Sequence, residues 1–581
     1  MINIDPIKLE IYWARVIAIA NEMMETLIRT SFSTVIRINR DCSAAIFDHE
    51  GRMLAQPDHS APGHIGCMPG VMRRLLKEFP PATIKPGDTF ITNDPWIGAG
   101  HSPDIYIASP IFYRAKLAGF ACTVAHHIDI GGRVGPTDSQ DVYEEGLLIP
   151  PMRLYRAGER NEDLFRMIET NVRLPHIILG DLDAQMASNH LGSQRLIEFG
   201  EDYGLDEFSQ VAHAITSSTE KAMRDRIRNL PDGAWKIQHE LELLDENGKP
   251  ITIHLKAEIK GDSIVFDYEG TSPQVRRPIN CVLNYAMSYT VLGLKMLLAP
   301  EIPYNEGTQL PVTVKAPEGS ILNPRWPAAV WRRAVMGMQL PEIVFEVLTP
   351  VLPDKIIAGC GSTPMWLWLL SGWRPNGSRF VFQTHFMGGL GARNDKDGLP
   401  TAAFPYNMTD SPIEIFENGC PIVVHHRELL QDSGGEGRFR GGLGQEIAFS
   451  TAPAALGKIE GPLTASFSTG HLKSGPRGLS GGNSGTSAEV KVNDSIVTNS
   501  LITLKLNAGD TLTMRLPGGG GYHSPLTRDP QEVRADVEEG FVSPAAAHSV
   551  YGVVLREAEN SVDSAATQRL RLQMQAMNSG E

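Results

Sequence analysis

The distribution of glycine and proline constrains this chain most, because these residues limit how far a helix or strand can run. The 581 residues include 56 glycines and 40 prolines, which predicts many turns and shaped loops. Residues 7–30 contain neither, and their apolar side chains recur at spacings of three and four. With Asp5 as N-cap and Pro6 at the first helical position, this segment predicts one long amphipathic helix.

Short apolar runs separated by turns predict further elements in the first half of the chain. Residues 43–47 and 52–55 flank a turn that ends in Gly51, which is the pattern of a β-hairpin. Residues 161–228 are helical in character, with a break or kink at Pro175. A three-stranded meander is predicted for residues 235–244, 251–259 and 263–268.

In the second half of the chain, segments predicted as helices are followed by glycine-rich sequence. Helices are predicted for residues 284–298 and 329–351, and a helix followed by a short strand for 529–554. The polar residues 557–581 are expected to fray. From residue 419 onward, glycine pairs and short apolar runs predict a β-rich segment of sandwich type. Its run of four glycines, residues 518–521, is interpreted as a cluster of tight turns, with an anion cradle as the alternative.

These patterns together predict a multi-domain α+β protein. Its N-terminal region mixes helix and strands, its centre holds helical and meander segments, and its C-terminal part is rich in β-structure. The expected divisions are an α+β region at 1–160, a helical segment at 161–230, an α+β middle domain at 231–418, a β-rich domain at 419–525 and a helical tail at 526–581.

Charge, cysteine usage and apolar runs limit the compartment and the partners. The chain carries 53 basic and 67 acidic residues, a net charge of −14, which argues against a nucleic-acid coat or a binder of anionic membranes. Its six cysteines are scattered without a CxxC pair, as expected for reduced, buried thiols. Residues 1–10 lack the pattern of a signal peptide, and no apolar run is long enough to span a bilayer. We therefore expect a cytoplasmic protein without membrane or nucleic-acid partners.

The densest group of metal-capable side chains lies between residues 41 and 129. His101 and Asp104 are three residues apart across a Ser-Pro pair, and His126 follows a strand-like run. Such a turn can direct both side chains into one cavity. Two histidines and one aspartate leave a coordination position open for water, as in hydrolytic Zn²⁺ or Mn²⁺ sites. From spacing alone the alternative stays open that these residues only cap backbone groups, since no motif here is as specific as HExxH.

The residues around this group resemble signatures of the hydantoinase B/5-oxoprolinase family, in the expected order along nearly the whole chain. The segments that carry the resemblance are residues 40–48, 93–95, 101–104, 125–132, 144–146, 180–185, 303–307, 438–442 and 518–521.

The resemblance implies a B-type subunit of an ATP-dependent hydantoinase, oxoprolinase or lactamase that opens a cyclic amide with metal-activated water. The ATP would bind a companion A-type subunit, in an assembly of two A and two B chains, and bicarbonate is a further candidate reactant. The family's ligand pattern falls on His101, Asp104 and His126, with Asp41 as a fourth ligand or as the general base. His127 is the other candidate base.

The sequence departs from the family's common pattern in two places. Gly98-Ala99-Gly100-His101 replaces the usual Gly-Gly-Thr-His, and Trp331-Arg332-Arg333-Ala334 stands where many members carry Gly and Asn. The second departure affects a loop expected to shape the substrate pocket, so the particular substrate stays open. Two other functions also stay open: the equivalent subunit of an ATP-dependent ketone carboxylase, and a non-catalytic scaffold for the A-type chain.

Overall fold

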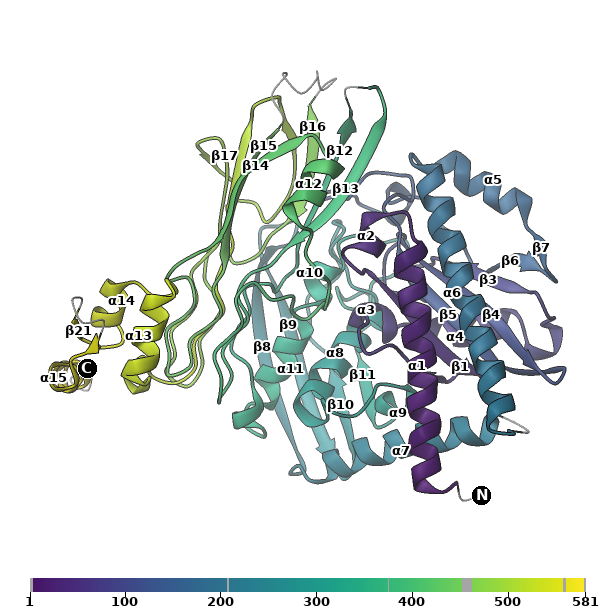
Figure 1. Cartoon of the computed structure of the whole chain (residues 1–581), viewed down its shortest axis with the longest axis horizontal. Coiled ribbons are helices and arrows are strands. Elements are labelled where there is room, and N and C mark those ends of the chain that lie inside the picture. Colours follow the sequence, from purple (N-terminus) through teal and green to yellow (C-terminus); the bar gives the residue numbers. More distant parts are fainter. Residues whose placement is uncertain (1–3, 206–207, 375, 452–461, 557–560, 579–581) are drawn as a thin grey trace.

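The computed structural model describes residues 4–205, 208–374, 376–451, 462–556 and 561–578. The protein is a multi-domain α+β structure with several sheets, as the sequence predicts. Figure 1 shows an N-terminal unit (purple and blue) on one side, a β-sandwich (green) above the middle of the molecule, and the C-terminal helices (yellow) at the opposite end.

The N-terminal unit is built on an antiparallel sheet with the strand order β2-β1-β5-β4-β3-β6-β7. Its strands are β1 (Cys42–Asp48), β2 (Met53–Ala55), β3 (Thr89–Thr92), β4 (Asp104–Tyr113), β5 (Lys116–His126), β6 (Met152–Arg156) and β7 (Glu159–Arg160). The predicted β1–β2 hairpin is confirmed. All residues of β1 are buried, because Ala44 and Ile46 pack in one core and Ala45 and Phe47 in another, on the other face.

Helices cover this sheet. They are α1 (Pro6–Thr30), α2 (Thr34–Arg37), α3 (Pro62–Ile65), α4 (Met68–Glu78), α5 (Glu162–Asn171), α6 (Pro175–Asp202) and α7 (Ser209–Arg228). The predicted long helix is α1, and the Asp5 carboxylate caps it by accepting hydrogen bonds from two backbone N–H groups. The predicted break lies between α5 and α6, which begins at Pro175. Because α6 packs on α1, β4 and β5, the predicted helical segment 161–230 adds a layer to the N-terminal sheet.

The middle of the chain contains the predicted meander of β8 (Gly233–Leu244), β9 (Pro250–Lys260) and β10 (Ser263–Asp267), extended by β11 (Val312–Lys315). Its helices are α8 (Leu283–Leu298), α9 (Glu306–Gln309), α10 (Ala334–Gly337) and α11 (Leu340–Leu348). The predicted continuous helix over 329–351 is wrong, because its first residues form a loop. The Asn280 side chain donates to the Ala329 carbonyl at 2.8 Å, and Glu145 accepts from the N–H of Val330 and of Trp331, so side chains satisfy the backbone there.

A β-sandwich follows, with a four-stranded and a five-stranded sheet. The first contains β12 (Trp366–Trp373), β13 (Arg379–Phe386), β16 (Leu463–Ser468) and β19 (Leu501–Leu506), and the second β14 (Ile422–Leu429), β15 (Gln445–Thr451), β17 (Glu489–Val492), β18 (Ser495–Ile496) and β20 (Thr511–Arg515). The short α12 (Ile413–Gly419) lies beside it. Strands β12 and β13 precede the expected boundary at 418, yet β12 pairs with β16. The sandwich therefore begins within the range expected for the middle domain.

Glycine-rich segments without strand structure run below the sandwich and hydrogen-bond to one another. We call residues 359–361, 388–391, 434–444, 475–485 and 518–521 the glycine bundle. Residues 518–521 occupy its centre: the N–H groups of residues 519, 520 and 521 donate to the carbonyls of Gly442, Gly359 and Asn483, respectively. A Cβ added to Gly519 would lie 2.1 Å from the Leu390 carbonyl oxygen. The interpretation of this run as a cluster of tight turns is therefore wrong: its partners are remote segments whose backbones approach too closely for any side chain.

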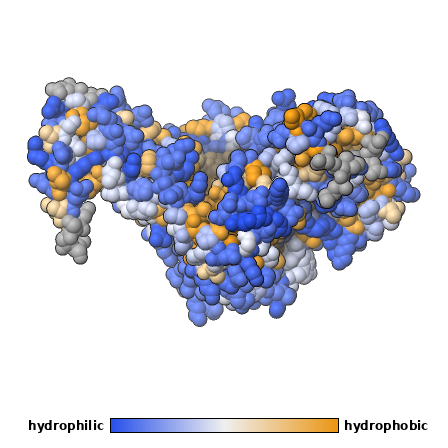
Figure 2. Space-filling model, turned by 90° about the horizontal axis from the view of Figure 1, so that it is seen from below, coloured by the Kyte–Doolittle hydropathy of each residue, from blue (hydrophilic) through white to orange (hydrophobic). Residues whose placement is uncertain are grey.

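The C-terminal part contains α13 (Pro530–Glu538), α14 (Pro544–Ser549), β21 (Leu555–Arg556), β22 (Ser561–Val562) and α15 (Ser564–Asn578). The expectation that residues 557–581 fray is wrong for α15, since Arg571 anchors this helix by donating to the carbonyls of Tyr551 and Arg528. Within the described ranges, no helix has both the length and the apolar character needed to cross a membrane. Figure 2 shows apolar residues in small groups among hydrophilic ones on the face seen from below.

Candidate metal centre

Three neighbouring strands of the N-terminal sheet each bring an acidic residue or a histidine to the same end of the sheet. Strand β1 begins directly after Asp41, β5 ends at His126, and β4 begins at Asp104. Asp104 and His126 are direct partners in the β4–β5 ladder, and the His126 N–H donates to the Asp41 carbonyl at 3.0 Å. Because antiparallel neighbours alternate in direction, the start of one strand lies beside the end of the next at this end of the sheet.

His101 joins them from the loop before β4. Gly100 precedes it with a φ of +85°, a conformation that favours glycine. Potential ligand atoms of His101, Asp104 and His126 all lie within 4.8 Å of one another, and the three residues are buried. The structure thus brings together the three ligands predicted from the sequence.

The hydrogen bonds of His101 determine which of its ring nitrogens is free to bind a cation. Its Nδ1 lies 3.1 Å from the carbonyl oxygen of Trp331, so Nδ1 must carry the proton that it donates. Burial and the Arg333 guanidinium lower the pKa of His101 to about 4, and the ring is neutral near pH 7. Its Nε2 then directs a lone pair at Asp104 Oδ2, only 2.9 Å away.

A cation bound by both atoms would remove the repulsion between two electron-rich atoms at this separation. The Nδ1 of His126 is likewise buried, with no hydrogen-bond partner in the described ranges. Two neutral imidazoles and one carboxylate are a donor set that suits Zn²⁺ or Mn²⁺. The residues present therefore fit a divalent cation.

Asp41 and His64 lie beside the three candidate ligands. The Nε2 of His64 is 3.1 Å from Asp104 Oδ1 and 3.5 Å from Asp41 Oδ1. Burial raises the pKa of Asp41 to about 6, and His64 opposes that rise. Burial lowers the pKa of His64, but the Asp104 and Asp41 carboxylates raise it more, so the net direction is upward. The pair can hold and pass a proton near neutral pH.

His127 does not line this cavity. Its Nε2 lies 3.1 Å from the side-chain oxygen of Gln185 on α6, and its backbone N–H donates to the Pro103 carbonyl. Adjacent residues at the end of a strand point in different directions, so His126 and His127 face different surroundings. Of the two candidate bases, His127 therefore contacts helix α6, whereas Asp41 lines the cavity.

Comparison with known proteins identifies the family of the chain. The family model for hydantoinase B/oxoprolinase matches residues 5–525. The chain belongs to the hydantoinase B/oxoprolinase family.

Relatives extend the match over almost the whole length. A putative B-type subunit of a D-/L-hydantoinase from Pseudomonas sp. (strain NS671) is 33% identical, with 98% of each chain covered. The beta subunit of caprolactamase from Pseudomonas jessenii is 30% identical over 98% of this chain and 99% of its own.

Solved structures share the fold. The ATP-dependent caprolactamase structure from Pseudomonas jessenii has a TM-score of 0.86 at 29% identity, covering 98% of this chain and all of that one. A nucleotide-free acetone carboxylase structure has a TM-score of 0.87 at 21% identity, covering 99% of this chain and 84% of that one. At that identity the second likeness concerns the fold alone.

The sequence did not predict that His64 lies in this site. The residue stands between glycines in Gly63-His64-Ile65-Gly66. Both glycines allow α3 to approach α8. A Cβ at Gly66 would lie 1.9 Å from the Ser288 hydroxyl, and one at Gly63 would lie 2.7 Å from the Tyr285 ring. The two glycines were the only sign in the sequence that this segment packs closely against another. The contact between α3 and α8 could not be predicted, because the two helices are more than two hundred residues apart in the chain.

The departure from the family pattern at 331–334 places a buried arginine in the centre. Arg333 donates from Nη2 to Asp104 Oδ2 at 2.9 Å and from Nε to the Ala99 carbonyl at 2.7 Å. Its guanidinium lies 4.6 Å from the centroid of the Tyr285 ring. Gly100 leaves room for it, since a Cβ there would lie 3.1 Å from the Arg333 Cγ.

Glu145 connects the two loops of the site. Its carboxylate accepts hydrogen bonds from the Val330 and Trp331 N–H groups and from the Ser139 hydroxyl, at 2.8–3.1 Å. Its backbone carbonyl accepts from the Ser102 hydroxyl at 2.9 Å. Burial raises the pKa of Glu145 to about 7, and the three donors to its side chain oppose that rise.

Replacing Glu145 by glutamine is expected to lower the melting temperature measured at pH 8, where the carboxylate is ionised. The new NH₂ group cannot accept, so buried N–H donors of the loop lose partners at a cost of roughly 1–3 kcal/mol. The control is Glu144→Gln, at a partly exposed neighbour whose carboxylate accepts from the Gln140 N–H and from Arg133 and not from the loop at Val330. Equal melting temperatures for the two variants would show that the Glu145 bonds do not hold the loop.

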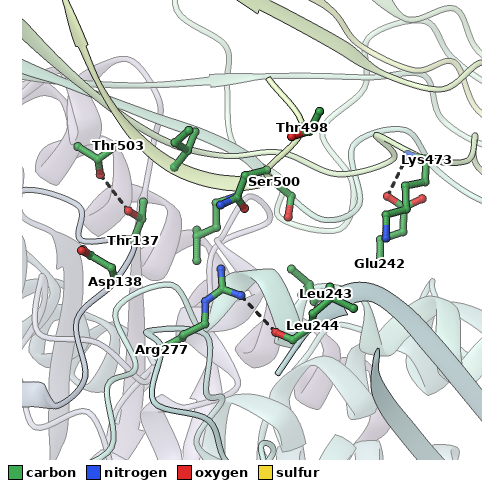
Figure 3. A pocket seen from close by; sticks show the side chains of 13 residues that line it. Thr137, Asp138, Glu242, Leu243, Leu244, Arg277, Lys473, Thr498, Ser500 and Thr503 are labelled. Atoms are coloured by element: carbon green, nitrogen blue, oxygen red, sulfur yellow. Dashed lines mark hydrogen bonds between the residues drawn. The ribbon is translucent and has the colours of Figure 1, made fainter. Parts of the chain in front are cut away.

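A larger cavity of about 640 Å³ opens where the N-terminal unit, the meander and the sandwich meet (Figure 3). Arg277 lies at its floor and donates to the Leu244 carbonyl at 3.2 Å, and the hydroxyls of Thr137 and Thr503 are hydrogen-bonded to each other at 2.9 Å on one side of it. Among the described residues, its lining does not bring three potential metal ligands together. The group His101, Asp104 and His126 differs from this lining, because its three potential ligands are close together and all buried.

Proposed function

We propose that this chain is the metal-bearing subunit of an ATP-dependent enzyme that opens a cyclic amide such as a hydantoin, 5-oxoproline or another lactam. The observation that carries the proposal is the neutral His101, whose Nε2 lone pair faces the Asp104 carboxylate at 2.9 Å in a buried cavity. The relatives named as subunits of a hydantoinase and of a caprolactamase support the substrate class.

His101, Asp104 and His126 would hold a Zn²⁺ or Mn²⁺ ion. When bound, such an ion acts as a Lewis acid and lowers the pKa of a water molecule to about 7. Asp41, with a pKa of about 6, is mostly ionised at neutral pH and can take a proton from the attacking water. His64 lies between Asp41 and Asp104, so it can pass a proton toward the nitrogen that leaves.

The reaction balances in these terms. With the amide oxygen phosphorylated, one water molecule bonds to the amide carbon, the carbon–nitrogen bond breaks and the released nitrogen gains a proton, which leaves an acyl phosphate. A second water molecule hydrolyses this acyl phosphate to the carboxylate and phosphate, so ring opening consumes ATP and two water molecules. We propose that an A-type partner chain uses ATP to phosphorylate the amide oxygen, which turns a poor electrophile into one that releases phosphate. The names of the relatives as subunits support a partner chain, and we propose two copies of each chain in the assembly.

The test is turnover by the complex of this chain with an A-type partner, ATP and metal. Hydantoin, 5-oxoproline and caprolactam are supplied in turn, and ring-opened product is measured together with ADP. Product from any of them, dependent on ATP, is the expected result. A parallel reaction contains acetone and ¹³C-bicarbonate. Label in an acetone-derived product, without ring opening of any amide, would replace the proposal by a ketone carboxylase.

A further inference from the structure

Gln383 on β13 has an unusual environment for a buried polar residue. Its side chain is 1% exposed and lines the same cavity as Asp41, His64, His101 and His126. Neither its Oε1 nor its Nε2 has a hydrogen-bond partner within the described ranges. Burying an amide with both groups unpaired costs stability, so both groups are available to a partner that enters the cavity.

Part of the cavity wall is apolar and adaptable. Met338, Met365 and Met408 line it, together with Leu367. The cavity measures about 20 Å³, enough for about one water molecule or ion, so a ring can enter only if side chains move. Methionine has three rotatable bonds and is suited to such movement.

Gln383 shares this small cavity with the candidate ligands His101 and His126 and with Asp41 and His64. A ring that displaces the methionine side chains would therefore meet Gln383 and the candidate metal ligands together.

We propose that Gln383 recognises the cyclic amide itself, through paired hydrogen bonds between two amide groups. In a small lactam the amide is cis, so its N–H and its C=O lie on the same side of the ring. A primary carboxamide presents an acceptor and a donor side by side, and its Oε1 and Nε2 match them. An open-chain amide is trans and directs the two groups to opposite sides, so it can use only one.

A carboxamide also suits the activated form of the substrate. When the lactam oxygen is phosphorylated, the ring nitrogen loses its proton and becomes an acceptor. A half-turn of the Gln383 carboxamide then presents Nε2 to that nitrogen. A carboxylate could not donate, and an ammonium could not accept. This inference rests on the proposed function and names the residue that gives it selectivity for rings.

The experiment measures binding to the metal-loaded chain in complex with its partner, without ATP. The probes are 2-piperidone and N-methyl-2-piperidone, which differ by the N–H alone. Wild type is expected to bind 2-piperidone roughly ten-fold more tightly, since methylation removes one hydrogen bond and leaves Oε1 unpaired. In Gln383→Met the two affinities become equal.

A second readout separates recognition from a structural role. In the ligand-free protein, Gln383→Met replaces an unpaired buried amide by an apolar side chain of similar length, so the melting temperature is expected to rise. If Gln383 stabilised the fold, replacing it would lower the melting temperature. Thr384→Val is the matched control, because Thr384 is the next residue on β13, is buried and also has an unpaired hydroxyl. This control should keep the ten-fold preference.

Equal affinity of wild type for the two probes, or an unchanged preference in Gln383→Met, would overturn the inference. Ring opening by the wild-type complex would leave the proposed function standing in either case. Failure of every cyclic amide to turn over, with the ten-fold binding preference intact, would instead remove the proposed hydrolysis while keeping Gln383 as the amide-binding residue.

Discussion

Replacing His126 by alanine is expected to remove the bound metal and nearly all ring-opening activity of the complex. The variant loses one of three candidate ligands, which leaves a single imidazole, His101, beside the Asp104 carboxylate. Loss of about 4 kcal/mol of metal-derived stabilisation lowers the rate roughly 10³-fold. Metal per chain by mass spectrometry and kcat of the purified complex are the measurements.

The matched control is His127→Gln. This residue is also a buried histidine, adjacent in the chain, but it contacts Gln185 outside the cavity. It should retain about one metal per chain and most of the activity. Metal retained in His126→Ala, or lost equally in both variants, would contradict the placement of the site.

Asp104 gives a less direct test. Its Oδ2 is also the partner of the buried Arg333, and Asp104→Asn would leave that guanidinium without its counter-charge. Breaking a buried pair in this way costs roughly 3–5 kcal/mol, so loss of metal could reflect loss of fold. His126 has no ion pair of this kind in the described ranges, which is why its replacement isolates the ligand role.

Replacing Gly519 by alanine is expected to prevent the C-terminal half from folding. The added Cβ would lie 2.1 Å from the carbonyl oxygen and 2.3 Å from the carbonyl carbon of Leu390, and 2.6 Å from the N–H nitrogen of Gly391. These are backbone atoms of the glycine bundle, which cannot turn aside as a side chain can. The cost should exceed about 4 kcal/mol, the range of the most damaging single substitutions. Soluble yield and the melting temperature measure it.

Gly372→Ala on β12 is the control for this substitution. The nearest atoms there are side-chain atoms of Phe380, at 3.2 Å and 3.5 Å, which can shift. We expect soluble protein with a melting temperature within a few degrees of wild type. A soluble Gly519→Ala variant with an unchanged melting temperature would mean that the bundle is packed more loosely than described.

The parts of the fold that follow local patterns were predictable from the sequence. The capped helix α1, the β1–β2 hairpin and the meander each depend on neighbours in the chain. The loop at 329–333 was predicted as part of a helix because its own residues favour one, whereas Glu145 and Asn280 hold its backbone from other elements. Long-range hydrogen bonds of this kind leave no local pattern.

The same division applies to the candidate site. His101, Asp104 and His126 were predictable because strand ends and turn residues carry ligand types at suitable spacing. Gln383 was not, since a glutamine inside an apolar strand is unremarkable until the unpaired amide and its cavity are seen. In the sequence, Arg333 was recognisable only as a departure from the common family pattern. The ion pair with Asp104, which explains why the arginine is buried, could be seen only in the structure.

The glycine bundle has a consequence for the order in which the protein can be made. The carbonyl of Gly359 accepts from the N–H of Gly520, about 160 residues further along the chain. At about 5–20 residues per second, a ribosome needs about 10–30 s to cover that interval. During this time the earlier glycine segments lack the central segment of the bundle, residues 518–521, and have few side chains with which to form a core. Protection of these segments by chaperones during synthesis, rather than stability of the finished fold, would then limit the yield of active protein.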